Sequence, residues 1–467
     1  MSQVVDAGMT VMRLNFSHAT KEEVELRLSS LKKSDGMFAL DGAHKSLRPV
    51  MLDTKGPEIR TGNLQAVKNT GDKKAKINLV TGDEITLTND LKFKECSDAK
   101  VMYVTYPSLA TTAGVGGSIL LDDGAVTLKV LSHTAGGDVV CRVENDGEIA
   151  SRRGVNLPGM KVDLPAMSEK DRADIRYGVG LDMDFVAASF VRSAAAVREI
   201  RAHIAACHAE FWPADYPMAK IIAKIESTEA LERLGEITDE ADGIMVARGD
   251  LGVEVPIEEV VIWQKEMVER CIAQAKGKPV IVATQMLESM QKAPRPTRAE
   301  VSDVTNAVLD GADCVMLSGE SANGKYPVES VKMMASIVRK TEEWMPPISD
   351  LDVLAEGSDS AADSVAASAV FGAEKLGAGL IVVRGDASGD LSRLVAKFRP
   401  SMPVVALVGS AKAARQLSIH RGVFPTLLAL EEALPAAKAQ GLIEAGDAVV
   451  TVEQGPAGEL SMAFSTA

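Results

Sequence analysis

Six short apolar runs in this chain of 467 residues each end in polar or charged residues. Such runs are typical of strands in a sheet that alternates with helices, where the carboxyl ends of parallel strands meet at one face. One polar strand end would be unremarkable, but six in one chain indicate a shared site. These ends are Arg13-Leu14-Asn15-Phe16-Ser17-His18, Asp53-Thr54-Lys55, Lys224-Ile225-Glu226, Arg248-Gly249-Asp250, Thr284-Gln285 and Ser318-Gly319-Glu320.

Two carboxylates and a lysine suggest the chemistry of this site. Glu226 and Asp250 are hard oxygen ligands, which suit Mg²⁺ or Mn²⁺ together with substrate oxygens. Lys224 precedes Glu226 by two positions and therefore lies on the same face of its strand. A cation there could neutralise charge on a transferring phosphoryl group. The alternatives are two salt-bridged carboxylates and a lysine that only satisfies a neighbour.

Two arginines and a glycine-containing turn could bind anions at the same edge. Arg13 and Arg60 could each bind a phosphate through two parallel hydrogen bonds. For either arginine alone, a surface salt bridge is an equally good interpretation. The backbone N–H groups of Gly249 and Asp250 precede a predicted helix and could hold a carboxylate. The segment Gly319–Lys325 resembles a Walker A loop, but Tyr326 stands where that motif needs Ser or Thr.

Composition excludes several classes of protein. The net charge of −14 argues against nucleic acid or an anionic membrane as the main partner. No run of eighteen apolar residues predicts a transmembrane helix, and the first residues do not read as a signal peptide. The five cysteines are scattered and predict reduced thiols, which favours a cytoplasmic location, with an organelle left open.

Alternating strand-like and helix-like segments predict an α/β protein in three parts. Seven predicted strands alternate with helices such as 21–33, 168–179, 257–276 and 298–310, one strand short of a (β/α)₈ TIM barrel. Short runs between Gly and Asp turns predict a small β-barrel domain inserted in a barrel loop. The predicted domains are the split barrel at 1–56 and 163–344, the inserted lid at 57–162, and a C-terminal α/β open-sheet domain at 345–467. The predicted barrel strands are 10–14, 49–52, 184–188, 220–225, 243–247, 279–283 and 314–317.

The motifs of this chain resemble those of the pyruvate kinase family. They stand in the family's order, and several run for eight residues or more, which makes chance similarity negligible. The motifs are 13–18 (RLNFSH), 52–62 (LDTKGPEIRTG), 154–159 (GVNLPG), 223–226 (AKIE), 243–252 (GIMVARGDLG), 283–290 (ATQMLESM), 296–303 (PTRAEVSD) and 316–320 (MLSGE).

The resemblance implies a role for each matching residue. Glu226 and Asp250 would bind Mg²⁺ or Mn²⁺, and Lys224 would stabilise the transferring phosphoryl group. Thr284, with the backbone of Gly249 and Asp250, would hold the substrate carboxylate. Thr284 and Ser318 are the two candidates for protonating the enol of pyruvate, and the sequence leaves that choice open. The other implied residues are Arg13 and Arg60 for phosphate, Asn15, Ser17, Asp53 and Thr54 for K⁺, and Asn15, His18, Arg60, Asp123 and Arg153 for the nucleotide.

The resemblance also implies an activity: transfer of a phosphoryl group from phosphoenolpyruvate to ADP, by a homo-oligomer that is a tetramer in the family. Two alternatives remain at this point. One is a non-catalytic or N-terminally truncated paralogue that acts only as an oligomer subunit, which the absence of the family's opening Thr-Lys-Ile strand would favour. The other is a different barrel enzyme acting on phosphoenolpyruvate or pyruvate, which leaves the inserted lid unexplained. Because a barrel without its first strand has two open edges, we expect the chain as given to be poorly soluble or inactive and the natural product to be longer.

Overall fold

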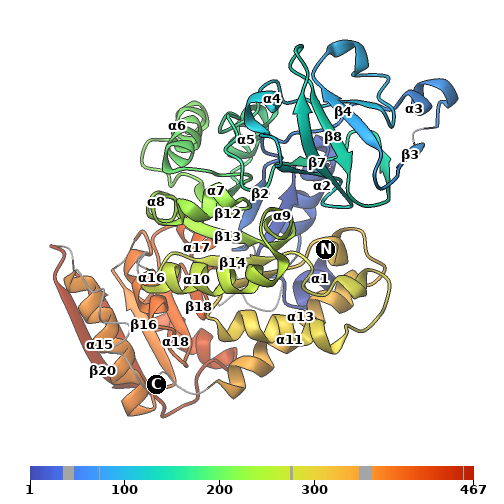
Figure 1. Ribbon diagram of the computed structural model, residues 1–467. Helices are drawn as coiled ribbons and strands as arrows, with labels where there is room; N and C mark the ends of the chain where they lie inside the picture. Colours follow the sequence, from blue (N-terminus) through green and yellow to red (C-terminus); the bar gives the residue numbers. More distant parts are fainter. Residues whose placement is uncertain (35–46, 73, 274–276, 346–359, 386, 456) are drawn as a thin grey trace.

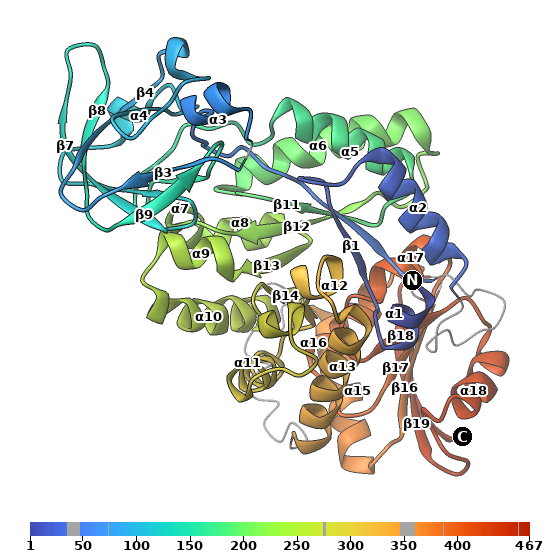
Figure 2. The same cartoon turned by 90° about the vertical axis from the view of Figure 1, so that its right-hand side faces the viewer.

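The computed structural model describes residues 1–34, 47–72, 74–273, 277–345, 360–385, 387–455 and 457–467. Three parts of the chain are each built on sheets of their own. Figures 1 and 2 show the central barrel-like part between an all-β part that projects from one end and the C-terminal α/β part at the other. The expected α/β architecture, with an inserted β domain and a C-terminal α/β domain, is confirmed.

The central part is a curled sheet of seven parallel strands in chain order. Most of its strand residues are buried, as expected for a parallel sheet covered by helices. Among the described strands, β1 and β15 each pair with one neighbour, so the sheet has two edges. The strands are β1 (Met12–Asn15), β2 (Val50–Asp53), β11 (Phe185–Ala188), β12 (Lys220–Ile225), β13 (Gly243–Ala247), β14 (Val280–Ala283) and β15 (Cys314–Met316).

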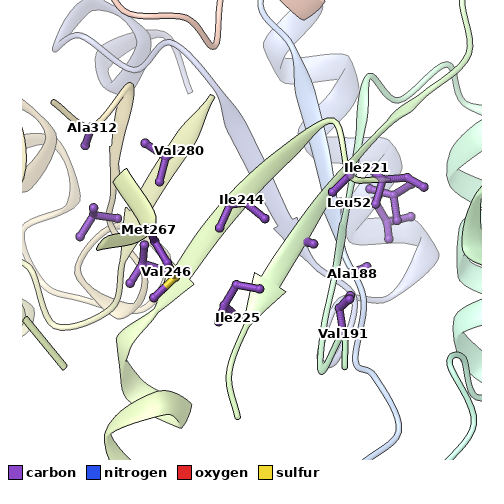
Figure 3. Close-up of a cluster of buried hydrophobic side chains, with 14 of the residues drawn as sticks. Leu52, Ala188, Val191, Ile221, Ile225, Ile244, Val246, Met267, Val280 and Ala312 are labelled. Atoms are coloured by element: carbon purple, nitrogen blue, oxygen red, sulfur yellow. The ribbon is translucent and has the colours of Figure 1, made fainter. Parts of the chain in front are cut away.

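Helices cover the outer face of this sheet and bury its apolar side chains. Figure 3 shows Leu52, Ile221, Ile244 and Val246 from neighbouring strands, with Met267 of a covering helix close by. The helices of this part are α1 (Ser2–Asp6), α2 (Lys21–Lys32), α5 (Glu169–Gly180), α6 (Ala194–Phe211), α7 (Thr228–Glu232), α8 (Leu234–Glu240), α9 (Arg248–Glu254), η2 (Ile257–Glu259), α10 (Val260–Ala273), η3 (Glu288–Gln291), α11 (Arg298–Leu309), α12 (Gly319–Ala322) and α13 (Pro327–Trp344).

Local sequence explains where three of the covering helices begin. A Ser or Thr side chain accepts a hydrogen bond from the third residue of the helix, whose acidic side chain bonds back to the cap. Such capping boxes begin α2 at Thr20, α5 at Ser168 and α11 at Thr297.

The inserted part is antiparallel for the most part and has its own apolar core. Its two sheets run β10-β6-β7-β8-β4-β5 and β3-β9. Its strands are β3 (Lys76–Leu79), β4 (Glu84–Thr88), β5 (Val101–Tyr103), β6 (Ser118–Leu121), β7 (Val126–His133), β8 (Val139–Val143), β9 (Gly147–Ala150) and β10 (Val155–Asn156), and its short helices are α3 (Gln65–Thr70), η1 (Leu91–Phe93) and α4 (Leu109–Thr112). We call this part the lid.

The C-terminal part is a five-stranded sheet in the order β18-β17-β16-β19-β20, parallel except for its last strand. Helices flank it, and two apolar clusters form its core. Its elements are α15 (Ala361–Leu376), β16 (Leu380–Arg384), α16 (Asp390–Lys397), β17 (Val404–Leu407), α17 (Ala411–Leu417), β18 (Val423–Thr426), α18 (Leu430–Ala439), β19 (Ala448–Gln454) and β20 (Leu460–Thr466).

Ion pairs join the C-terminal part to the amino ends of the central strands. Lys412 and Arg415 of α17 contact the carboxylates of Asp182 and Asp184, at 2.9 Å and 2.8 Å for the closest atoms of Lys412–Asp182 and Arg415–Asp184. Asp184 in turn accepts the backbone N–H of Val50, where β2 begins. This contact therefore lies at the opposite end of the sheet from the polar strand ends.

Some sequence-based expectations miss details of this fold. The helix predicted over 257–276 is divided into η2 and α10, and residues 274–276 lie outside the described part. Short apolar runs predict lid strands at 77–80, 85–88, 118–121, 126–131 and 139–143, which leaves out β5, β9 and β10. Those of the C-terminal part predict strands at 380–383, 403–408, 423–428 and 448–452, which leaves out β20, and no helix is predicted for α18. The domain boundaries remain a prediction, and residues 346–359 at the second boundary lie outside the described part. None of the described helices is long and apolar enough to cross a membrane.

Candidate active site

Five of the six polar strand ends contribute to one cavity of about 210 Å³ at the carboxyl ends of the central strands, and the end at Ser318-Gly319-Glu320 does not line it. A second cavity of about 170 Å³ lies between this edge and the lid, and the two share Glu58, Arg60, Phe190, Glu226 and Asp250. The predicted site residues that line the first cavity are Arg13, Asn15, Ser17, His18, Asp53, Thr54, Arg60, Lys224, Glu226, Asp250 and Thr284, and those that line the second are Arg60, Asp123, Arg153, Glu226 and Asp250.

Lys224 lies at the centre of a polar network in the first cavity. Its Nζ is 2.6 Å from Ser189 Oγ, 3.2 Å from Asp53 Oδ1 and 2.9 Å from Glu226 Oε1. Only 9% of Lys224 is exposed. Burial opposes its charge, but Asp53 and Glu226 outweigh that effect and raise the pKa of Lys224. The side chain is therefore held as a cation.

Asp53 joins this lysine to Arg13. The carboxylate is 1% exposed and accepts a hydrogen bond of 2.6 Å from Arg13 Nε. Burial alone would raise the pKa of Asp53, but Lys224 and Arg13 lower it. Arg13 is thus paired inside the cavity, on the wall that also holds Lys224, and is not a surface salt bridge.

Glu226 and Asp250 form a carboxylate pair that fits a divalent cation. Burial, followed by the charge of Glu226, raises the pKa of Asp250 to about 7. Glu226 is 1% exposed, and its Oε1 is paired with Lys224 Nζ at 2.9 Å. A cation between the two carboxylates would offset the burial and the repulsion that raise the pKa of Asp250. In the described part of the chain, no group of three or more His, Cys, Asp or Glu side chains forms a metal site, so substrate or water oxygens would have to supply the remaining ligands.

The four residues expected to bind K⁺ line the first cavity at the ends of the neighbouring strands β1 and β2, where Asn15 is paired with Asp53. Asn15 Oδ1 accepts the N–H of Ser17 at 3.0 Å, which fixes the turn after β1. Thr54 Oγ1 accepts the N–H of Ser189 at 3.0 Å. Amide, hydroxyl and carboxylate oxygens of this kind can replace the water shell of a monovalent cation.

Thr284 has a backbone conformation that threonine rarely adopts. Its φ is 70°, in the left-handed region, and its side chain is β-branched. Its Oγ1 accepts the N–H of Gly249 at 2.7 Å and lies 2.6 Å from the carbonyl oxygen of Ala283. Thr284 and the backbone of Gly249, which are expected to hold the substrate carboxylate together, therefore lie side by side. Ser318 follows β15, but neither of the two cavities is lined by it.

The nucleotide-side residues surround the second cavity less tightly. Arg60 Nε donates to Glu58 at 2.6 Å and Nη1 to the carbonyl oxygen of Arg152 at 2.8 Å. Its bond to Glu58 raises the pKa of Arg60. Arg153 contacts Asp122 at 3.4 Å, while Asp123 and His18 are exposed. These residues are placed for a ligand that enters beneath the lid.

Two residues after β11 contribute to the site but were not predicted from the sequence. Ser189 bonds Lys224, and Phe190, with φ 55°, donates its N–H to Glu226 Oε2 at 2.5 Å. A signal was available, because Ser189 is the polar end of a seventh strand. Ser189 was missed because the hydrophobic Phe190 follows it, so the strand end does not read as polar. Phe190 acts through its backbone N–H, which every residue except proline has, so its sequence gives no signal.

Comparisons with known proteins agree with the geometry. Residues 1–331 match the family model described as pyruvate kinase, barrel domain, and residues 363–463 match the one described as pyruvate kinase, alpha/beta domain. The human protein named pyruvate kinase PKLR is 42% identical over 97% of this chain and 79% of its own length. Pyruvate kinases of Geobacillus stearothermophilus, 42% identical, and Agaricus bisporus, 43% identical, match 98% and 90% of this chain and 75% of their own lengths.

Proposed function

This chain belongs to the pyruvate kinase family, and from that premise we propose which of its residues carry out the reaction. The enzyme transfers the phosphoryl group of phosphoenolpyruvate to ADP and yields pyruvate and ATP, the last step of glycolysis. The observation that supports the residue assignment best is that Lys224, Glu226, Asp250 and Thr284 line a single cavity at the strand ends.

Lys224 neutralises the phosphoryl group during transfer. The three equatorial oxygens of that group carry the charge of the transition state, and a fixed cation in a buried site stabilises it more than a solvated one does. Asp53 and Ser189 hold the ammonium in place. Arg13, on the same wall, binds the phosphate before transfer, and Arg60 contacts it from the lid side.

Thr284 and the turn at Gly249 and Asp250 hold the carboxylate of phosphoenolpyruvate. The hydroxyl of Thr284 and the N–H of Gly249 already lie within 2.7 Å of each other, so a carboxylate oxygen that displaces their mutual bond meets two donors. Transfer leaves the enolate of pyruvate, whose C3 takes up a proton. Thr284 lines the cavity and Ser318 does not, which favours Thr284 as the nearer hydroxyl.

Glu226 and Asp250 hold Mg²⁺ or Mn²⁺, and Asn15, Ser17, Asp53 and Thr54 hold K⁺. The bound cations supply positive charge to the substrate oxygens. The burial of Glu226 close to Asp250 and the raised pKa of Asp250 support the divalent site. The position of all four oxygen-bearing residues in the lining of the first cavity supports the K⁺ site.

ADP enters between the lid and the strand ends. Arg60, Asp123 and Arg153 line the second cavity, and Asn15 and His18 lie on the adjoining wall of the first. The two cavities meet at Glu226 and Asp250, the two residues that would hold the divalent cation and its positive charge between the two substrates. This continuity supports a direct transfer between the two substrates.

The chain forms a homo-oligomer, and two exposed apolar surfaces support a tetramer with two kinds of two-fold contact. The edge strand β20 has the sequence LSMAFST, with no charge or proline to protect its free edge, and six of its seven residues are exposed. Figure 1 shows β20 at the outer side of the C-terminal part, beside α15. The second surface lies at η2 and α10, where Ile257 is 72% and Ile262 is 63% exposed. A charged Ala463→Lys substitution is expected to halve the assembly in light scattering, and an unchanged mass would contradict this interface.

The enzyme acts in the cytoplasm. All five cysteines are free thiols, and the pKa values of Cys141, Cys271 and Cys314 are raised to about 12 by burial. Burial makes these thiols unreactive, and it is the lack of a disulfide among the five cysteines that suits a reducing compartment.

A lactate-dehydrogenase-coupled assay with phosphoenolpyruvate and ADP tests the activity of the purified chain. We expect pyruvate formation that requires both substrates, Mg²⁺ and K⁺. A folded, monodisperse sample without turnover would contradict the assignment and support a non-catalytic subunit.

A further inference from the structure

Thr284 lies in the candidate active site with a strained backbone, and contacts with its neighbours must maintain that conformation. Thr284 and Gln285 have φ values of 70° and 54°. The left-handed region is unfavourable for a β-branched side chain and persists only where the surroundings enforce it. The contacts around Thr284 therefore show what keeps its hydroxyl in the cavity.

Arg248 donates hydrogen bonds to the backbone carbonyl oxygens on both sides of the Thr284 Cα. Its Nε donates to the carbonyl oxygen of Ala283 at 3.1 Å, and its Nη2 donates to that of Thr284 at 2.8 Å. Gly249, the next residue, donates its N–H to the Thr284 hydroxyl. Arg248 thus bonds the backbone of Thr284, and the next residue, Gly249, bonds its side chain.

Asp303 fixes this arginine from outside the cavity. The carboxylate accepts 2.6 Å hydrogen bonds from both Nη1 and Nη2 of Arg248, and Gln264 accepts a weaker bond of 3.3 Å. All three guanidinium nitrogens are therefore engaged, in the planar fork that a lysine cannot reproduce. The Arg248 side chain is only 12% exposed.

The helix that carries Asp303 also supports the segment after Thr284. Glu300, one turn earlier on α11, accepts the N–H and the hydroxyl of Ser289, at 2.7 Å and 2.6 Å. One face of α11 thus binds the turn that carries Thr284 at two places, through Arg248 and through Ser289. This explains what the acidic residues of the motif 296–303 do, although they lie outside the cavities.

We propose that the Asp303–Arg248 pair is a positioning device that holds Thr284 in its left-handed conformation and thereby places its hydroxyl at the substrate. The inference rests on the proposed function for its kinetic consequence, but its structural content is independent of it. Asp303 touches no substrate on this account and acts only through Arg248.

The chain contains a matched control for this pair. Asp313 accepts two hydrogen bonds from Arg399, at 2.7 Å and 2.8 Å, and their side chains are 1% and 10% exposed. Asp313 precedes β15 at the amino end of the sheet, away from the cavity. Breaking either pair removes a bidentate contact, with the Asp303 side chain 29% and the Asp313 side chain 1% exposed, but only the Asp303 pair contacts Thr284.

The test compares Asp303→Asn with Asp313→Asn in the full-length protein. Asp303→Asn keeps the shape but loses the charge and one acceptor, so we expect kcat to fall at least fivefold, with KM for ADP changed less than twofold. Asp303→Glu, which retains a carboxylate, should recover part of the loss. Asp313→Asn should lower the melting temperature and keep kcat within twofold. If Asp303→Asn does not fold, Arg248→Lys is measured in the same way, with the same expectation.

A crystal structure of the Asp303→Asn variant provides a readout that does not depend on activity. We expect Thr284 to leave the left-handed region or its hydroxyl to lose the bond to Gly249. A folded variant that keeps both features, or a fall in kcat of less than fivefold, would overturn the proposal. If instead the wild-type protein does not turn over phosphoenolpyruvate, the proposed function fails while this structural readout still decides the inference.

Discussion

Lys224 donates a 2.6 Å hydrogen bond to the hydroxyl of Ser189, which itself bonds the carbonyl oxygen of Thr54 at 2.7 Å. Ser189 thus ties the lysine of β12 to the end of β2. Glu226, the third partner of the lysine, is also a proposed cation ligand. When Glu226 binds the cation, Ser189 and Asp53 are the partners that still orient the Lys224 ammonium toward the phosphoryl group.

Removing the hydroxyl of Ser189 should weaken catalysis more than binding. A hydrogen bond to a charged group is worth about 1.5–3 kcal/mol, so we expect Ser189→Ala to lower kcat by about 10- to 100-fold. Ser189→Thr keeps a hydroxyl and serves as the control. Steady-state kinetics measure both variants, and a Ser189→Ala enzyme with kcat within twofold of wild type would refute this role.

Glu226→Gln should weaken Mg²⁺ binding, because an amide offers one neutral oxygen in place of a charged carboxylate. Calorimetric titration of Mg²⁺ into the protein measures the effect directly, and we expect at least a tenfold loss of affinity. Glu254→Gln is the matched control, since Glu254 lines the second cavity and bonds Asn156 at 3.3 Å. Equal losses in the two variants would show that general charge, and not a specific ligand, governs binding.

The activity should require a monovalent cation. Glu58 stands in the Gly-Pro-Glu-Ile-Arg motif where, by the family resemblance, K⁺-independent members carry Lys. In the structure it pairs with Arg60 at 2.6 Å and Lys55 at 3.3 Å and supplies no positive charge of its own. We expect little turnover in a buffer free of K⁺ and NH₄⁺, and a smaller K⁺ requirement in Glu58→Lys. Full wild-type activity without these ions would be inconsistent with the K⁺ site.

His420 should make the fold sensitive to mild acid. It lies between α17 and β18, is 5% exposed, and its Nδ1 has no hydrogen-bond partner. Burial lowers its pKa to about 3, and Lys220, Arg393 and Arg399 act in the same direction against Asp313. The folded state therefore binds fewer protons than the unfolded state between pH 6.5 and 3, so stability falls as pH falls through that window.

The expected contribution of this histidine is at most about 1.4 kcal/mol per pH unit. We compare melting temperatures of wild type and His420→Gln from pH 7 to pH 4. The substitution removes the titrating group, so the variant should lose less stability on acidification. Parallel curves for the two proteins would show that His420 stays uncharged in both states or charges equally in both.

The sequence predicts the central sheet well because its signals are local. All seven central strands lie within two residues of their predicted ends, since apolar β-branched runs and polar strand ends mark them. The last strand, β20, escapes prediction because most of its residues are exposed, and its pairing with β19 is decided by tertiary contact.

The candidate site is predictable for side chains and not for backbone geometry. Lys224, Glu226 and Asp250 follow from residue type and position in a parallel sheet. The left-handed φ of Thr284, the N–H of Phe190 at Glu226 and the reach of Arg248 to Asp303 depend on loop conformation. Such contacts join residues 36 and 55 positions apart in the chain, and no local pattern encodes them.

The central claim is that Lys224 stabilises the phosphoryl group in the transition state of transfer, and Lys224→Met tests it most directly. Methionine keeps the length of the side chain and removes the charge, so the loss should appear in kcat far more than in KM. We predict a kcat at least a thousandfold below wild type in the coupled assay, in a protein that still binds Mg²⁺. A folded Lys224→Met enzyme that retained even a tenth of the wild-type kcat would contradict the account.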